Sequence, residues 1–268
     1  MARKQFLSFL LIFSLLFSCA SALAETDDDD DWDDNVDDAW EMEHPLHSGD
    51  YAYALLDDGT VEITSYGGAD TEIVIPDTLD GKPATAIGER AFYYSLSLTS
   101  VTIPDSVTCI SKRAFSCCYN LMSIALPSGL TAIEPGTFEL CNSLTSIAIP
   151  DSITTIAEDA FVSCKALQSF TLSPNHPYFF LADGALCRTV DNTLLFYPNA
   201  RENRTYRIPD GIAAISAYAF YDCDLLESVV IPDSITQIPE RAFYGCSALA
   251  SVSLPDSLTE IGIAAFSF

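Results

Sequence analysis

The chain has 268 residues, and 38 acidic residues against 12 basic ones give it a formal net charge of −26 at pH 7. Nucleic acids and anionic lipid surfaces bind cationic protein surface, so this charge argues against both as partners. The three histidines lie near no recognisable nucleophile or set of metal ligands. We therefore expect no enzymatic activity, no metal site and no cofactor.

The first residues have the features of a targeting segment. Basic residues 3–4 precede an apolar run from Phe6 to Phe17, and residues 22–24 form an A-x-A cleavage signal. The run is too short to span a bilayer comfortably, so we predict residues 1–24 to be a cleaved signal peptide. The protein would then be secreted or displayed on the cell surface, with no transmembrane segment left. Lipid anchoring at Cys19, in a sequence that loosely resembles a lipoprotein box, is the alternative.

An acidic segment follows at residues 25–48. Nine of the twelve positions from Asp27 to Asp38 are aspartates. Such a segment cannot bury enough apolar surface to offset the entropy of ordering, so we predict it to be disordered. We interpret it as a solvated spacer. Weak Ca²⁺ binding and an adhesive acidic tail are the alternatives, although the segment lacks the glycine and the spaced glutamate of an EF-hand loop.

Residues 49–68 have the pattern of a β-hairpin. Tyr51–Leu56 and Thr60–Tyr66 flank Asp57-Asp58-Gly59. An aspartate-glycine pair between two such runs favours a tight turn between antiparallel strands. We predict that this hairpin caps the repeats that follow.

The rest of the chain repeats with a period of 23 residues. A fixed period of this length predicts a solenoid, in which each repeat buries its apolar side against its neighbours. A leucine is followed by apolar residues three and five positions later and then by a proline, which predicts a short strand ended by the proline. Two further apolar residues and a phenylalanine, usually preceded by alanine, complete the repeat. The phenylalanines that keep this spacing are Phe92, Phe115, Phe138, Phe161, Phe220, Phe243 and Phe266.

A cysteine lies three residues after most of these phenylalanines, and Ser95 takes its place in the first repeat. Cysteine is small and apolar enough to be buried, so one cysteine per repeat predicts an inward ladder of free structural thiols. Disulfide bonds are the alternative, since an exported protein forms them readily. The predicted ladder consists of Cys118, Cys141, Cys164, Cys223 and Cys246.

The unit C-x-x-L-x-x-I-x-I-P-x-x-I-x-x-I-x-x-x-A-F resembles the repeats of the BspA-like (Treponema pallidum type) leucine-rich-repeat family over residues 69–268. We therefore expect a β-rich leucine-rich-repeat solenoid with a minor helical contribution and one short strand per repeat. The resemblance implies a bacterial surface or secreted protein with roles in adhesion and protein binding. The family shares no catalytic residues, so the resemblance implies no activity.

The strand residues that face away from the core are one candidate binding surface. The second residue after each leucine is a serine, and side chains two apart share one face of a strand. This surface is small, flat and nearly uncharged, so we interpret it as a solvent face rather than a tight site. The row consists of Ser100, Ser123, Ser146, Ser169, Ser228 and Ser251.

An interruption of the period is the second candidate. Phe161 and Phe220 are 59 residues apart, which is one period plus 36 residues. We predict a hairpin-like insertion at about residues 173–207, and insertions in solenoids often form the binding face. The alternative is that the insertion repairs the solenoid locally and buries its own aromatic residues. The candidate contact residues are Tyr178, Phe179, Phe180, Arg188, Arg201, Arg204 and Arg207.

Two functions follow from these patterns. The first is a secreted or cell-surface binding module that recognises a protein or glycan on a host, on its matrix or on a neighbouring cell. The second is a structural envelope protein that assembles with itself. The repeat that begins at Leu249 is incomplete and would leave Leu254, Leu258, Ile261 and Phe266 uncovered. A homodimer through this end would bury them.

Overall fold

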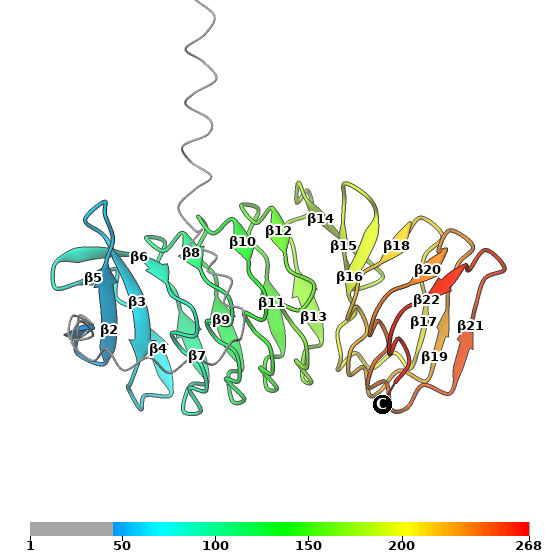
Figure 1. Ribbon diagram of the computed structural model, residues 1–268, viewed down its shortest axis with the longest axis horizontal. Coiled ribbons are helices and arrows are strands. Elements are labelled where there is room, and N and C mark those ends of the chain that lie inside the picture. Colours follow the sequence, from blue (N-terminus) through cyan, green and yellow to red (C-terminus); the bar gives the residue numbers. More distant parts are fainter. Residues whose placement is uncertain (1–44, 268) are drawn as a thin grey trace, which may run out of the picture. The chain divides into compact units, whose positions relative to one another are not determined.

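The computed structural model describes residues 45–267. The predicted signal peptide, Cys19 and most of the acidic segment lie outside these residues. The described part is a stack of β-repeats (Figure 1). Residues 45–267 contain no helix, so the fold is β-rich as predicted, and the minor helical contribution is not found there. Consequently, no helix in this part of the chain is long and apolar enough to cross a membrane.

Each repeat contributes one short strand to a first row of parallel strands. The central residue of each strand points into the core, and its two neighbours point outward, because successive side chains alternate across a strand. Only the last strand, β21, has a partly exposed central residue. The strands of this row are β4 (Glu72–Val74), β7 (Ser100–Thr102), β9 (Ser123–Ala125), β11 (Ser146–Ala148), β13 (Ser169–Thr171), β17 (Thr205–Arg207), β19 (Ser228–Val230) and β21 (Ser251–Ser253).

A second row lies on the opposite side of the stack (Figure 1). Most of its strands have two residues, and the isoleucine at the second position is buried in every two-residue strand except the last. Turns that begin with Pro-Asp join the first row to the second in most repeats, and Pro127-Ser128 takes this place after β9. The second row consists of β6 (Lys82–Ile87), β8 (Cys109–Ile110), β10 (Ala132–Ile133), β12 (Thr155–Ile156), β16 (Thr193–Phe196), β18 (Ala214–Ile215), β20 (Gln237–Ile238) and β22 (Glu260–Ile261).

The register of these strands confirms the period. Ser100 pairs with Ser123, and Ser228 pairs with Ser251, so neighbouring strands are offset by one repeat. The first repeat is longer, because Glu72 pairs with Ser100. Its five additional residues include the turn between β5 (Thr78–Leu79) and β6, which pair antiparallel.

The N-terminal hairpin is present as predicted. Strands β2 (Tyr51–Leu55) and β3 (Val61–Tyr66) pair antiparallel, and β3 pairs in parallel with β6 of the first repeat. The acidic segment, however, ends earlier than expected. Residues Leu46–Ser48 form β1, which pairs with β2 across the turn at Gly49, whose φ of 59° suits a tight turn. The prediction of disorder through residue 48 was wrong because a backbone ladder does not require apolar side chains.

The phenylalanines form an internal ladder in two runs, one on each side of the inserted segment. Phe92, Phe115, Phe138 and Phe161 stack on one another at ring-centroid distances of 4.9, 6.0 and 5.5 Å. Tyr66 of the cap stacks on Phe92 at 5.4 Å and so continues the ladder into the hairpin. Each ring is covered on both faces, which no single repeat could achieve alone.

The interruption is smaller than its sequence indicated. Tyr197 lies 23 residues before Phe220 and stacks on it at 5.3 Å, so a tyrosine holds the ladder position here. Strand β17 follows in regular register with β19. Residues 197–207 thus belong to an ordinary repeat, and the predicted insertion at 173–207 was too long. What remains is the antiparallel hairpin β14 (Phe179–Ala182) and β15 (Ala185–Arg188), which continues antiparallel into β16.

This hairpin divides the interior into two hydrophobic clusters. Leu186 and Leu195 belong to the cluster on the N-terminal side. Cys187 and Leu194, their neighbours in sequence, belong to the cluster on the C-terminal side. Alternation along a strand places successive side chains on opposite faces. We call β15 and β16 the partition, because they are the layer that both clusters pack against.

Candidate functional site

The five predicted ladder cysteines are buried, and none of them forms a disulfide bond in the structure. Each thiol donates to the backbone carbonyl of the ladder residue 26 positions earlier, at 3.0–3.7 Å. For example, the Sγ of Cys164 lies 3.1 Å from the carbonyl oxygen of Phe138. Cysteine therefore fills a small apolar space and supplies one hydrogen bond between neighbouring repeats. These residues are structural parts of the core.

The thiols give a test of this arrangement. Burial raises the pKa of Cys118 and Cys164 to about 12. The thiolate is the reactive form, so at pH 8 we expect iodoacetamide to label both residues about a thousandfold more slowly in the folded chain than in the urea-unfolded chain. As the pH rises above 9, the unfolded chain releases these protons first, so the stability of the fold should decrease there. Peptide mass spectrometry measures the labelling, and fast labelling of the folded chain would contradict the buried ladder.

The predicted serine row lies on the outer face of the first strand row. Ser100 pairs in register with Ser123, Ser146 with Ser169 and Ser228 with Ser251. The hydroxyl of Ser123 donates to that of Ser100 at 3.1 Å. Thr205 joins the row opposite Ser228, a position that the sequence pattern did not include. The strand pairing of this row is interrupted between β9 and β11 and again between β13 and β17. The surface is flat and polar and carries no anchor for a ligand among its serines.

The four arginines of the predicted insertion do not form one cationic patch. Arg188 pairs with Asp191 at 2.7 Å, and its hydrogen bonds lower the pKa of that carboxyl to about 2. Arg201 donates to Asp183 and lies over the ring of Tyr197, 5.7 Å from its centroid. Arg204 directly precedes β17 and Arg207 is its last residue, and each has a carboxylate partner of its own, in the pairs Arg204–Glu227 and Arg207–Asp210. Each charge is thus neutralised within the chain.

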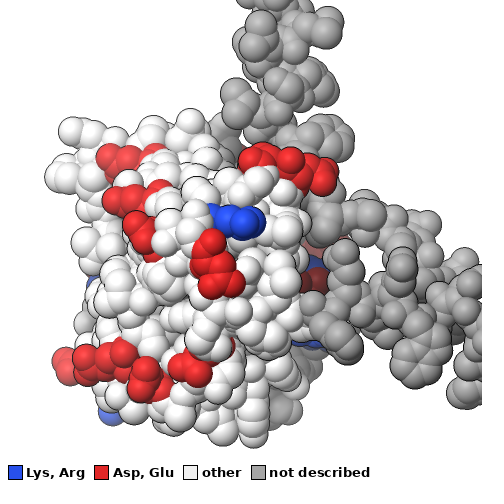
Figure 2. Space-filling view, turned by 90° about the vertical axis from the view of Figure 1, so that its left-hand side faces the viewer, with Lys and Arg blue, Asp and Glu red and all other residues white. Residues whose placement is uncertain are grey.

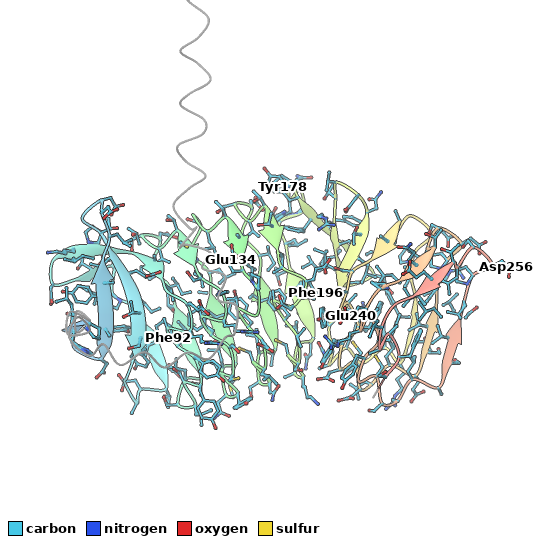
Figure 3. All side chains as sticks on the ribbon, in the orientation of Figure 1. Phe92, Glu134, Tyr178, Phe196, Glu240 and Asp256 are labelled. Carbon is cyan, nitrogen blue, oxygen red and sulfur yellow. The ribbon has the colours of Figure 1, made fainter. Side chains whose placement is uncertain are left out.

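The aromatic residues of the insertion differ in exposure. Tyr178 lies at the outer edge of the stack and is 44% exposed, whereas Phe196 lies in the interior (Figure 3). Phe179 is buried in the N-terminal cluster beside the ring of His176, so it was wrongly placed among the contact residues. The backbone amides of Tyr178 and Phe179 donate to Nδ1 of His176. His176 therefore anchors the start of the hairpin, and Tyr178 and half-buried Phe180 remain accessible.

The sequence analysis overlooked a third surface, formed where the chain turns around each ladder phenylalanine. We call the segment from two residues before to two residues after it the phenylalanine turn. Tyrosines occur in these turns near both ends of the stack. At the N-terminal end, Tyr93 and Tyr94 are 48% and 54% exposed, and the ring of Tyr94 meets the edge of Tyr119 at 5.9 Å. The sequence feature that could have revealed this surface is the presence of tyrosines beside ladder phenylalanines, at positions where the repeat has no fixed residue.

These turns have an unusual backbone. The residue two before the phenylalanine is left-handed in six repeats, and so is the residue two after it. Arg90 and Tyr94 occupy these positions at φ values of 59° and 61°, where Gly136 and Gly245 lie in later repeats. A left-handed conformation costs a residue other than glycine on the order of 1 kcal/mol. The left-handed backbone recurs in most repeats, with exposed side chains such as Arg90 and Tyr94 at some of these positions and buried ones such as Cys117 at others.

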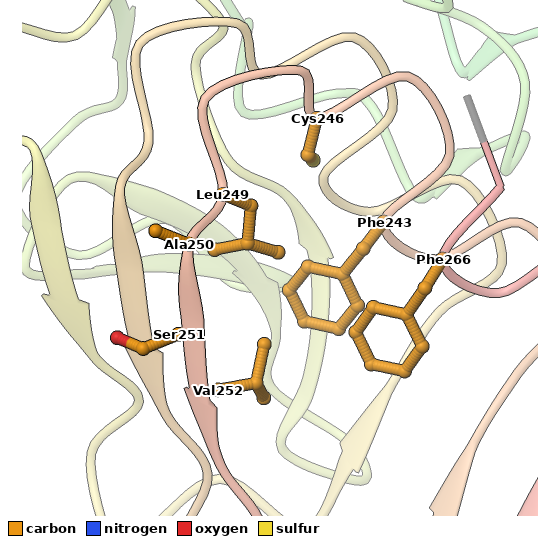
Figure 4. Close-up of a pocket in the computed structure, with 7 residues that line it drawn as sticks. All are labelled: Phe243, Cys246, Leu249, Ala250, Ser251, Val252 and Phe266. Carbon is orange, nitrogen blue, oxygen red and sulfur yellow. The ribbon is translucent and has the colours of Figure 1, made fainter.

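The last described repeat leaves apolar surface uncovered. Leu254, Ile261 and Ile263 are 46%, 51% and 77% exposed. In the same repeat, a cavity of about 110 Å³ is lined by the rings of Phe243 and Phe266 on one side and by residues of β21 on the other (Figure 4). In the preceding repeats this side of the core is covered by the next repeat.

Acidic side chains dominate the N-terminal end of the described chain, with few basic ones among them (Figure 2). Within residues 45–267, however, no three histidine, cysteine or carboxylate side chains come together as ligands for a metal ion.

A stack of 23-residue parallel β-repeats with a leucine, isoleucine and phenylalanine interior defines the class of leucine-rich-repeat solenoids. The sequence model of the family described as BspA type leucine rich repeat region matches residues 71–180 and 196–268 in six copies. The chain belongs to this family. The family match does not include residues 181–195, which hold most of the inserted hairpin and the start of β16. No curated protein matched the chain.

Solved structures agree with this assignment. The crystal structure of a leucine-rich-repeat protein of T. pallidum is 28% identical, with a TM-score of 0.50, and the match covers 82% of this chain and 86% of that one. A leucine-rich-repeat protein from Eubacterium ventriosum is 24% identical, with a TM-score of 0.63 and coverage of 80% and 66%. The pneumococcal vaccine antigen PcpA is 19% identical, with a TM-score of 0.57 and coverage of 82% and 78%. The last two show the fold alone.

Proposed function

We propose that the chain is an exported binding module that is secreted or displayed on the cell surface and recognises a protein partner. The observation that carries this proposal is the division of the repeat into two sets of residues. The leucine, isoleucine, phenylalanine and cysteine positions are almost all buried and hold the solenoid together. The positions that vary from repeat to repeat expose tyrosine, methionine and arginine, the residue types that are enriched in protein interfaces.

Export is supported by the sequence of residues 1–24, which has a basic start, an apolar run and a cleavage signal. Adhesion to a host, its matrix or a neighbouring cell is the role implied by the family resemblance. The expectation that the chain has no catalytic activity stays a prediction, as does the exclusion of nucleic acid. A glycan partner is the alternative within this proposal. Tyr178 and Phe180 of the inserted hairpin are further candidate contacts.

The experiment is a capture followed by a direct measurement. The full chain is immobilised and exposed to extracellular-matrix and cell-envelope extracts, and each retained protein is purified and titrated by surface plasmon resonance. We expect saturable binding to at least one purified protein with a Kd of about micromolar or tighter. The matched control is the same chain after unfolding and alkylation, which has identical charge without the solenoid surface. If no purified protein binds the folded chain more tightly than this control, the proposal is wrong.

Self-association is a second candidate function, favoured by the uncovered apolar side chains of the last repeat. Two copies that meet through this end would cover Ile261 and Ile263. Multi-angle light scattering at micromolar concentration tests it, with the I261D/I263D variant as the matched control. A wild-type chain that remains monomeric would exclude this candidate.

A further inference from the structure

The most exposed aromatic surface of the described chain lies on, and directly after, the phenylalanine turns of the first two repeats. We call it the N-terminal tyrosine patch and define it as Arg90, Tyr93, Tyr94, Leu96 and Tyr119. The two neighbouring tyrosine rings lie 6.2 Å apart, and Tyr119 packs against Tyr94. Leu96 is 41% exposed, and its carbonyl accepts a hydrogen bond from Asn120 in the turn that carries Tyr119. The patch thus spans two repeats and is held in place by both.

The tyrosines of this patch are held by contacts with one another, through the ring pairs Tyr93–Tyr94 and Tyr94–Tyr119. The thiol of Cys117 is buried, and hydrogen bonding to it raises the pKa of the Tyr93 and Tyr119 phenols. Rings that are positioned before a partner arrives lose little side-chain entropy on binding. Tyrosine also offers a large apolar ring together with a hydroxyl, which makes it a frequent anchor in protein interfaces.

The patch also carries a positive charge that has no carboxylate partner within the described residues. The guanidinium of Arg90 lies over the ring of Tyr93 at 5.9 Å from its centroid. No carboxylate among residues 45–267 pairs with it, whereas Lys112 and Arg113 in the next repeat are paired with Glu89 and Glu139. In a chain with a large excess of acidic residues, an exposed arginine without a carboxylate leaves a place for one from a partner.

A second group of tyrosines lies beside an arginine that is paired with a carboxylate of this chain. Tyr218, Tyr221 and Tyr244 lie on the phenylalanine turns near the C-terminal end. There Arg241 donates to the hydroxyl of Tyr218 at 3.1 Å and pairs with Glu240 at 3.0 Å. All three tyrosines are less exposed than Tyr93 and Tyr94. The arginine of this second group is therefore paired within the chain, and the group serves as a matched control.

We propose that the N-terminal tyrosine patch docks a peptide segment of a protein partner that presents an aromatic or large apolar side chain beside a carboxylate. The apolar side chain lies against Tyr93, Tyr94 and Leu96, and the carboxylate accepts hydrogen bonds from Arg90. The inference deepens the proposed function and rests on it. It assigns the surface and the chemistry of the partner, neither of which follows from the repeat pattern.

The backbone supplies variants that remove the patch without damaging the fold. Arg90 and Tyr94 are left-handed, and later repeats place Gly136 and Gly245 at the same two positions. The double substitution R90G/Y94G therefore removes both side chains and relieves an unfavourable backbone conformation. We expect its melting temperature to equal or exceed that of the wild type. Tyr218, also left-handed at φ 59°, gives the control substitution Y218G in the second group.

The probe is a phage-displayed library of random dodecapeptides, selected on the full chain. We expect enriched peptides that combine an aromatic or large apolar residue with a nearby Asp or Glu. Synthetic copies should bind R90G/Y94G at least tenfold more weakly than wild type, while Y218G binds as wild type does. Equal binding to R90G/Y94G, or no enrichment at all, would overturn the proposal. Glycans from an array that bind wild type and lose binding to R90G/Y94G would assign the patch to sugars and equally overturn it.

The two proposals can fail separately. If purified partners from the capture experiment bind R90G/Y94G and wild type equally, the chain is still a binding module and the patch is not its site. If no purified partner binds but the selected peptides bind the patch, the patch recognises peptides while the proposed biological role fails.

Discussion

Replacing Phe138 with alanine is expected to lower the free energy of unfolding by about 3–5 kcal/mol. Phe138 is fully buried and stacks on Phe115 at 6.0 Å and on Phe161 at 5.5 Å. The substitution removes apolar contact on both faces of the ring and leaves a cavity in a rigid stack. In a solenoid the stability depends on the interfaces between neighbours, so one internal position weakens two of them.

The measurement is urea unfolding followed by far-UV circular dichroism. Phe266 provides the matched control, since it is partly exposed and its only described ring neighbour is Phe243 at 5.1 Å. Phe266→Ala should therefore cost clearly less than Phe138→Ala. An equal loss for the two variants would show that stacking on both faces is not what stabilises the ladder.

The second large effect is expected at the partition. Leu194→Ala and Leu195→Ala should each cost about 2–5 kcal/mol, because both side chains are buried to 1% exposure or less. The two substitutions should destabilise different parts of the stack. Leu195 packs in the N-terminal cluster and Leu194 in the C-terminal cluster, although they are adjacent in one strand.

Hydrogen exchange resolved by peptide mass spectrometry distinguishes these losses. Leu195→Ala should increase exchange mainly in β11 and β13, and Leu194→Ala mainly in β18 and β20. Exchange that rises equally on both sides in both variants would contradict the partition and indicate a single cooperative core. The pair is its own control, because the two substitutions are chemically identical and one residue apart.

Most of the core could be predicted from the sequence. Each repeat meets the next at the same offset, so Ser100 pairs with Ser123 as Ser228 pairs with Ser251. A residue buried in one repeat is then buried at the equivalent position in most others, and the period alone identifies Phe92, Phe115 and Phe138 as core. The prediction failed where a different amino acid occupies an equivalent position of the repeat. Tyr197 stacks like a phenylalanine, so the repeat that it begins was counted as part of the insertion.

The candidate sites were less predictable, because exposure and pairing depend on residues from different repeats. The cluster of arginines in residues 188–207 suggested a cationic surface, yet each of them meets a carboxylate that the fold brings close, as Glu227 is brought to Arg204. The sequence did not predict the N-terminal tyrosine patch, because Tyr94 and Tyr119 are 25 positions apart. Only the stacking of two repeats places their rings in contact.

The sequence by itself determined the solenoid, its register and nearly all of its buried residues. Each repeat packs on its neighbour in the same way, so residues spaced by one period occupy equivalent positions in the core. The tertiary structure alone decided that β15 and β16 form a partition between two hydrophobic clusters, and that Arg90 has no carboxylate partner within the described chain. Those properties depend on which face of each strand meets which cluster, and on which side chains of neighbouring repeats come close together. Periodicity contains neither kind of information.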